Sequence, residues 1–236
     1  MVIKELIKRS PIRILEKSTH GGLGKGNLGV IAAKKGVGKT AVLVHLATDQ
    51  LFQGKHVIHV SFSSNTSHIV DWYEDIFSEI TRRYDLDEAM QVHNEIIRNR
   101  VIMNFSQDGV GVDQIVKSLK AMIDDGGFRT DVIVVDTFDF AKAKPDDIEL
   151  FRSFAEKAGV EVWISATLPA GPSTTDENGY PSLLSSVMDS VAVLVLLMPK
   201  EGFVHLELTK DHDTATTSDM HLKLDPKILL IAREDS

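Results

Sequence analysis

The chain has 236 residues, of which 43% are hydrophobic, with a formal net charge of -8 and no cysteine. This hydrophobic content is enough for a packed core, which excludes a disordered or fibrous chain. The lack of cysteine excludes disulfides, thiolate metal sites and thiol nucleophiles, and the negative charge argues against general attraction to nucleic acid or anionic lipid.

The sequence also predicts a cytoplasmic protein without a membrane segment. The longest unbroken apolar run, residues 191–198, is far shorter than the roughly 20 residues that cross a bilayer as a helix. The first residues, MVIKELIKR, carry charges and lack the apolar stretch of a signal peptide.

Short β-branched runs alternate with longer segments of helical period, which is the pattern of a parallel sheet with crossover helices. After a lead-in segment, residues 1–20, the predicted strands are 28–33, 56–62, 101–105, 132–136, 160–166, 191–198 and 204–208. The predicted helices are 40–52, two helices within 67–98 that separate near Tyr84, then 112–124 and 146–158. The segment 168–181 is rich in Gly, Pro, Ser and Thr and predicts a loop. Since the strands after this loop follow without helices, we expect one α/β domain over residues 1–236, with a mainly parallel sheet and antiparallel edge strands.

The strongest chemical signal is the segment 33–40, AKKGVGKT, which lies between the first predicted strand and the first predicted helix after it. It matches the phosphate-binding loop pattern, with Ala33 in place of the first glycine. Glycines let the backbone amides turn towards phosphate oxygens at the positive end of a helix, and the lysine neutralises the β- and γ-phosphates. We therefore expect ATP to bind at Lys35, Gly36, Val37, Gly38, Lys39, Thr40 and Ala41, with Lys39 also acting as a catalytic group.

A metal position follows from the buried strand 132–136, which ends in an acid at the edge where open α/β sheets bind ligands. Thr40 would offer its hydroxyl to Mg²⁺, and Asp136 would hold the ion through water on the opposite side. The alternative is that Asp136 only caps the next segment. Asp139, three residues later, either reaches the same metal or is a loop acid.

The stretch 11–33, PIRILEKSTHGGLGKGNLGVIAA, resembles the segment that leads into RecA-type ATPase domains, in particular those of the clock protein KaiC and the DnaB-type replicative helicases. Their similar GGL-x-x-G-x-L turn precedes the phosphate-loop strand, and the helicases commonly have alanine at the first loop position. The resemblance continues through the later strands and covers nearly the whole chain. It implies a RecA-like three-layer fold that binds ATP with Mg²⁺ and assembles into a homo-oligomer.

One departure from this family lies after the second predicted strand. Ser63 and Ser64 stand where RecA-type ATPases usually carry a glutamate that polarises the attacking water. Neutral hydroxyls are poor general bases near pH 7. Unless another acid such as Asp139 or Asp71 takes over, this predicts slow or absent hydrolysis.

A second departure lies in the segment 210–213, KDHD. The resemblance implies a Lys-x-Arg pair here that reaches into the nucleotide of the neighbouring subunit. Lys210 matches the lysine and would act catalytically in trans, whereas His212 replaces the arginine. Because an arginine in trans contributes about 10³ to 10⁵ in rate, its loss also predicts weak hydrolysis.

Two other function classes remain as alternatives to a nucleotide-dependent switch. The string KKGVGKT also resembles the deviant loop of MinD and ParA positioning ATPases, in which Lys34 would reach the partner's nucleotide. A DNA-dependent recombination or helicase motor would grip a strand with the loops 137–147 and 168–186. The first loop has two lysines against three acids and the second has no Lys or Arg, so nucleic acid is not an expected partner. The sequence does not indicate a protein partner.

Overall fold

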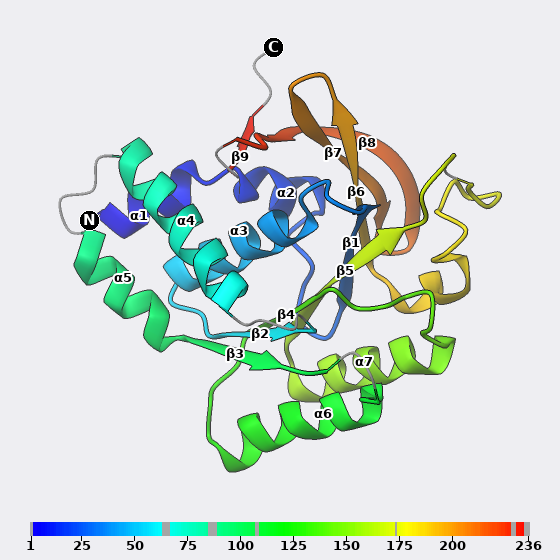
Figure 1. Ribbon diagram of the computed structural model, residues 1–236, viewed down its shortest axis with the longest axis horizontal. Coiled ribbons are helices and arrows are strands. Elements are labelled where there is room, and N and C mark those ends of the chain that lie inside the picture. The colour runs from blue at the N-terminus through cyan, green and yellow to red at the C-terminus, as the bar shows by residue number, and fades with distance from the viewer. Residues whose placement is uncertain are drawn as a thin grey trace.

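The computed structural model describes residues 2–62, 67–84, 89–106, 109–172, 174–227 and 230–233. Within these residues the β-branched runs form one nine-stranded sheet in the order β3-β2-β4-β5-β1-β6-β7-β8-β9 (Figure 1). The strands are β1 (Leu28–Lys34), β2 (Val57–Ser61), β3 (Arg100–Asn104), β4 (Val132–Asp136), β5 (Glu161–Leu168), β6 (Val193–Lys200), β7 (Phe203–Asp211), β8 (Thr214–Leu224) and β9 (Ile231–Arg233). All pairings from β3 to β6 are parallel, and those from β6 to β9 are antiparallel. The predicted α/β fold, mainly parallel with antiparallel edge strands, is confirmed.

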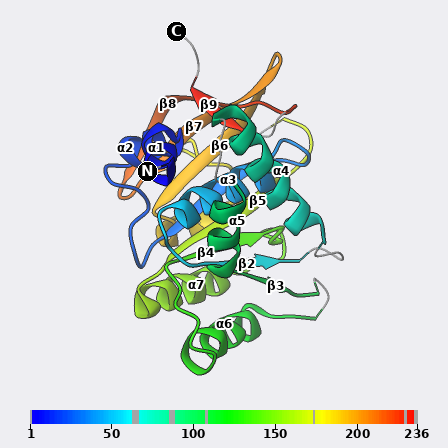
Figure 2. The same cartoon turned by 90° about the vertical axis from the view of Figure 1, so that its left-hand side faces the viewer.

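Helices cover both faces of the sheet, which gives three layers (Figures 1 and 2). The helices are α1 (Val2–Arg9), α2 (Ile12–Ser18), α3 (Lys39–Phe52), α4 (Ser67–Tyr84), α5 (Ala89–Arg98), α6 (Val112–Lys120) and α7 (Pro145–Ala158). Helices α1 to α5 pack in one apolar core with one face of the sheet, and α6 and α7 pack in a second core on the other face. Because both faces are covered, β2 and β4 are buried along their whole length. None of the described helices is long and apolar enough to span a membrane.

The predicted elements agree with the structure in the parallel part of the sheet and less well at the two ends of the chain. The seven predicted strands and the helices of 40–98, 112–124 and 146–158 are confirmed, with ends that differ by a few residues. The expectation that no helix follows the loop 168–181 is wrong, because a short 3₁₀ helix, Ser185–Ser190, precedes β6. Two helices, α1 and α2, lie in the segment expected only as a lead-in, and β8 and β9 were not predicted.

The two N-terminal helices pack against α3. Leu6, Ile12 and Leu15 are at most 5% exposed and belong to the same apolar core as α3. Arg13 of α2 pairs with Asp49, a carboxylate of α3 that is 3% exposed. Burial raises the pKa of Asp49, and hydrogen bonds from Ser10, Arg13 and Gln53 act against this rise. The first helices are therefore tied to the central helix by apolar contacts and by a nearly buried ion pair.

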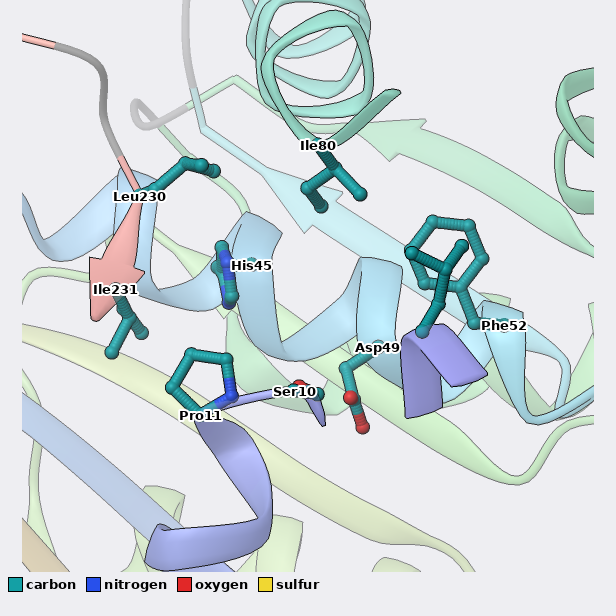
Figure 3. A pocket seen from close by; sticks show the side chains of 9 residues that line it. Ser10, Pro11, His45, Asp49, Phe52, Ile80, Leu230 and Ile231 are labelled. Carbon is teal, nitrogen blue, oxygen red and sulfur yellow. The ribbon is translucent and has the colours of Figure 1, made fainter. Parts of the chain in front are cut away.

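A small cavity of about 30 Å³ remains where these helices meet α3 (Figure 3). His45 and Asp49 of α3 line it together with residues from α1, α4 and the C-terminal strand. This volume suits a water molecule or two and is far too small for a nucleotide. The cavity lies along the middle of α3, whereas the phosphate-loop segment precedes the first turn of that helix.

Arg13→Ala should lower the free energy of unfolding by about 3 kcal/mol, because it leaves the buried carboxylate of Asp49 without its counter-charge. Urea unfolding of the variant and the wild type measures this loss. In an Asp49→Asn background the same Arg13→Ala change should cost much less, since no buried charge is left unpaired. Equal losses in both backgrounds would mean that Arg13 stabilises by packing alone.

Candidate functional site

The phosphate-loop segment joins β1 to α3 at the carboxyl edge of the parallel strands. Gly36 and Gly38 have φ angles of 80° and 116°, in the left-handed region that favours glycine. At Gly38 a Cβ atom would also lie 2.4 Å from Cδ2 of Leu224, at the end of β8. The backbone conformation therefore favours glycine here, and a side chain would also displace the Leu224 methyl group. Glycines of this kind let the loop amides point towards a bound anion.

Lys39 is the first residue of α3, and its side chain folds back over the loop. Its Nζ donates hydrogen bonds to the carbonyl oxygens of Ala33 at 3.2 Å and Lys34 at 3.1 Å. Lys39 as a whole is only 9% exposed. Burial lowers the pKa of the Lys39 ammonium, and the carboxylate of Asp136 acts against this shift. A partly desolvated ammonium at a helix N-terminus is suited to an anionic oxygen such as that of a phosphate.

Thr40 and Asp136 meet across the gap between α3 and β4. The Thr40 hydroxyl donates to Oδ2 of Asp136 at 2.7 Å, and the Ser165 hydroxyl of β5 donates to Oδ1 at 2.8 Å. Asp136 is 2% exposed, so both carboxylate oxygens are fixed in direction. Ser165 is not among the predicted site residues, although a hydroxyl within the apolar strand EVWISATL is a signal that could have indicated it.

These two side chains fit a magnesium ion. A hydroxyl oxygen and a carboxylate oxygen at hydrogen-bonding distance are hard oxygen donors of the kind that Mg²⁺ prefers, and the ion usually completes its shell with waters and substrate phosphates. Among the described residues no cluster of three or more His, Cys, Asp or Glu side chains could hold a metal ion by itself. Thr40 and Asp136 would supply two of the oxygen ligands of Mg²⁺, and waters and a nucleotide would supply the others.

Thr137 connects this site to the end of β2. Its backbone has a φ angle of 60°, which is unusual for a residue with a side chain. Its N–H donates to Ser165 Oγ at 2.9 Å, and its hydroxyl accepts from the N–H of Phe62 at 3.3 Å. The residue that follows β4 is thus hydrogen-bonded to Phe62, the residue that follows β2.

A cavity of about 370 Å³ opens between the loop and the segment after β4. Its size falls in the usual range of ligand sites, about 300 to 1,000 Å³. It is lined by Lys35, Gly36, Gly38, Lys39, Thr40, Asp136, Thr137, Phe138, Asp139, Phe140 and Thr167. A second cavity of about 210 Å³ shares Thr137, Phe138 and Asp139 with it. The phosphate-loop residues and the acid of β4 therefore face one common space.

Other residues singled out in the sequence lie elsewhere. Lys210 of β7 is paired with Leu194 of β6, and Leu194 is paired with Val30 near the start of β1. Lys210 therefore lies away from the end of β1 that leads into the phosphate loop. Its Nζ donates to the carbonyl oxygen of Met188 in the same chain at 2.5 Å, and burial lowers its pKa. Asp71 is exposed on α4 and does not line the cavity. Ser63 and Ser64 lie outside the described residues.

Comparison with known proteins identifies the type of domain. A family model described as an AAA domain matches residues 4–163, which include the phosphate loop, α3 and β4. No curated protein matches the chain.

Proposed function

The chain belongs to the AAA-domain family of P-loop ATPases, and we propose that it binds ATP with Mg²⁺ and acts as a self-assembling, nucleotide-dependent switch that hydrolyses ATP slowly. The observation that carries this proposal is the convergence of Lys39, Thr40 and Asp136 on one cavity of about 370 Å³. Lys39 would leave the carbonyls of its own loop for the phosphates, and Thr40 and Asp136 would hold the metal. When bound, Mg²⁺ would neutralise part of the phosphate charge.

Within the P-loop ATPases we assign the chain to the RecA-like group. The GGLGKG segment before β1, the parallel strands β3 to β6 and the antiparallel strands after them support this assignment. Self-assembly is part of the same proposal, since it follows from the resemblance to KaiC and DnaB-type domains.

Slow hydrolysis is supported by the residues that would act from a neighbouring subunit. Both ring nitrogens of His212 have partners in their own chain, Oδ1 of Asp211 at 2.7 Å and the carbonyl oxygen of Leu23 at 3.3 Å. Lys210 is held by the Met188 carbonyl. Both side chains are therefore held by contacts in their own chain, and His212 lacks the permanent charge of an arginine.

A DNA-dependent motor receives less support. Lys142, one of the two lysines of the loop after β4, lies 3.4 Å from the carboxylate of Asp139. Its charge is therefore partly compensated before any phosphate arrives. For the positioning-ATPase alternative, the side chain of Lys34 is exposed and its carbonyl accepts from Lys39, which does not distinguish a role across a dimer from a solvent-exposed lysine.

Light scattering with and without a non-hydrolysable ATP analogue and Mg²⁺ tests the switch. We expect the mass to rise in multiples of the 26.1 kDa chain only with the analogue, and hydrolysis to be slow and unaffected by single-stranded DNA. Lys39→Ala is the control that should stay unassembled. Assembly that stops at two chains and requires Lys34 would favour the positioning class. Brisk turnover stimulated by single-stranded DNA would favour the motor, and an unchanged mass would contradict the switch.

A further inference from the structure

Among the described residues, the cavity of the phosphate loop is lined by two carboxylates, Asp136 and Asp139. Asp136 is 2% exposed and its two oxygens accept from Thr40 and Ser165, as suits a group that holds a metal. The side chain of Asp139 is 44% exposed. Of the two carboxylates, Asp139 is therefore the one that lines the proposed nucleotide cavity and is also accessible to solvent.

Two phenylalanines fix the backbone on either side of Asp139. Phe138 and Phe140 are 8% and 6% exposed, and their rings meet edge to face at a centroid distance of 5.1 Å. Phe138 also contacts Phe62 of the segment after β2 and Phe151 of α7. Because both neighbours are anchored in the core, Asp139 has little freedom to leave the rim of the cavity.

Local hydrogen bonds set the direction of the Asp139 carboxylate. Oδ1 accepts from the N–H of Ala141 at 3.1 Å, and Oδ2 lies 3.4 Å from the ammonium of Lys142. Each oxygen keeps a second acceptor position, since a carboxylate can accept about four hydrogen bonds. A carboxylate in this position can act as a general base, whereas the serine hydroxyls at 63 and 64 are poor bases.

Asp139 lies where the two cavities meet. Thr137, Phe138 and Asp139 line both the cavity of about 370 Å³ and the one of about 210 Å³. The smaller cavity has room for several waters, so water can approach the phosphate site past this carboxylate. Asp147 lines only the smaller cavity, and its Oδ2 accepts from the N–H of Lys144 at the start of α7.

From this placement we infer that Asp139 is the catalytic residue that activates the attacking water, which deepens the proposed ATP-dependent function and rests on it. The water oxygen forms a bond to the γ-phosphorus while the bond from that phosphorus to the β,γ-bridging oxygen breaks. ADP leaves with the electron pair of the broken bond, and the water proton passes to the Asp139 carboxylate and then to solvent. The group thus replaces the glutamate that is missing after β2.

Asp139→Asn should lower kcat for ATP at least 100-fold, because a positioned general base contributes about 10² to 10⁴ in rate. The KM for ATP and the rise in melting temperature with ATP and Mg²⁺ should stay unchanged, since the amide retains the shape but cannot take a proton. Asp139→Glu should recover part of the rate. Asp147→Asn is the matched control, since it changes an acid of the smaller cavity alone, and it should leave kcat within about threefold.

Measuring nucleotide binding and ATP turnover separately distinguishes the role of Asp139 from the proposed ATP binding on which it rests. Wild-type protein that binds ATP but shows no turnover, or Asp139→Asn protein that hydrolyses ATP at the wild-type rate, would overturn the role of Asp139 and leave ATP binding intact. Equal loss of rate in Asp139→Asn and Asp147→Asn would also overturn it, because general acidity around the cavity would then explain the effect. Absence of any nucleotide binding to the wild type would contradict the proposed function itself.

Discussion

Replacing Lys39 by alanine should remove most of the thermal stabilisation that ATP with Mg²⁺ gives to this protein. A ligand that binds only the folded state at about 100 times its dissociation constant adds about 2.7 kcal/mol, which raises the melting temperature of a chain of this size by about 5 to 10 °C. In the proposed site Lys39 would supply the ammonium that pairs with the phosphates, and a charge-assisted hydrogen bond to phosphate has no substitute in an alanine. Differential scanning fluorimetry at millimolar nucleotide measures the shift.

The Lys39→Ala variant should fold without nucleotide, so a lost shift in melting temperature would report lost binding and not unfolding. Lys39→Ala removes hydrogen bonds to the carbonyls of Ala33 and Lys34, each worth about 1 kcal/mol. It also removes the cost of burying an ammonium whose pKa is lowered by that burial. These two effects oppose each other, so the melting temperature without nucleotide should change little.

Lys34→Ala is the matched control, since Lys34 is an exposed lysine of the same loop. Its nucleotide-dependent shift should equal that of the wild type. A wild-type protein with no shift at millimolar ATP would show that this loop does not bind nucleotide. Loss of the shift in Lys34→Ala but not in Lys39→Ala would contradict the role given to Lys39.

The central part of the fold could be predicted because its residues carry the signal themselves. Strands such as β2 and β4 are buried on both faces and read as continuous β-branched runs. The edge strand β8 alternates exposed and buried positions in the polar sequence TATTSDMHLKL, and its strand conformation depends on pairing with β7. A pattern of this kind is weak without knowledge of the neighbouring strand. Helix α2 similarly depends on its contact with α3 through Arg13 and Asp49.

The candidate site was predictable to the extent that parallel strands bring their carboxyl ends together. That rule places the end of β1 and the acid Asp136 at one edge of the sheet. In the structure the Thr40 hydroxyl lies 2.7 Å from Oδ2 of Asp136. The role of Ser165 depends on the register between β4 and β5, in which Val135 is paired with Ile164. The attachment of Lys210 to Met188 depends in turn on how β7 packs beside the 3₁₀ helix before β6. Neither strand register nor side-chain packing can be predicted from the local sequence alone.

Acid should destabilise the protein through His59, which lies fully buried on β2. Burial lowers the pKa of His59 to about 4 from its ordinary value of 6.5, with Asp136 acting against this shift and Arg100 adding to it. Below pH 6.5 the unfolded chain therefore binds a proton that the folded chain does not take up until about pH 4. Stability falls as the pH decreases through this window, by about 2 kcal/mol between pH 7.5 and pH 5 from this group alone.

The partner of His59 allows a variant that keeps the hydrogen bond without the titration. Burial raises the pKa of Tyr73, so its hydroxyl stays protonated and can donate to Nδ1 of His59, 3.1 Å away. The guanidinium of Arg100 lies 4.2 Å from the centre of the Tyr73 ring. Its positive charge adds to burial in opposing a positive charge on His59. In His59→Asn an amide oxygen can accept from Tyr73 at any pH.

Urea unfolding of His59→Asn at pH 7.5, 6.5 and 5.0 should show about 2 kcal/mol less acid destabilisation than the wild type. His68→Asn, which replaces an exposed histidine of α4, is the control for the loss of a histidine as such. If His59→Asn and the wild type lose the same stability between pH 7.5 and pH 5.0, the folded protein accepts a proton on His59 as readily as the unfolded chain. Because Asp136 is the carboxylate whose field favours that proton, Asp136→Asn should lower the pH at which the folded protein protonates His59. The loss between pH 7.5 and pH 5.0 should then stay at about 2 kcal/mol, and the loss that comes from His59 should continue below pH 4.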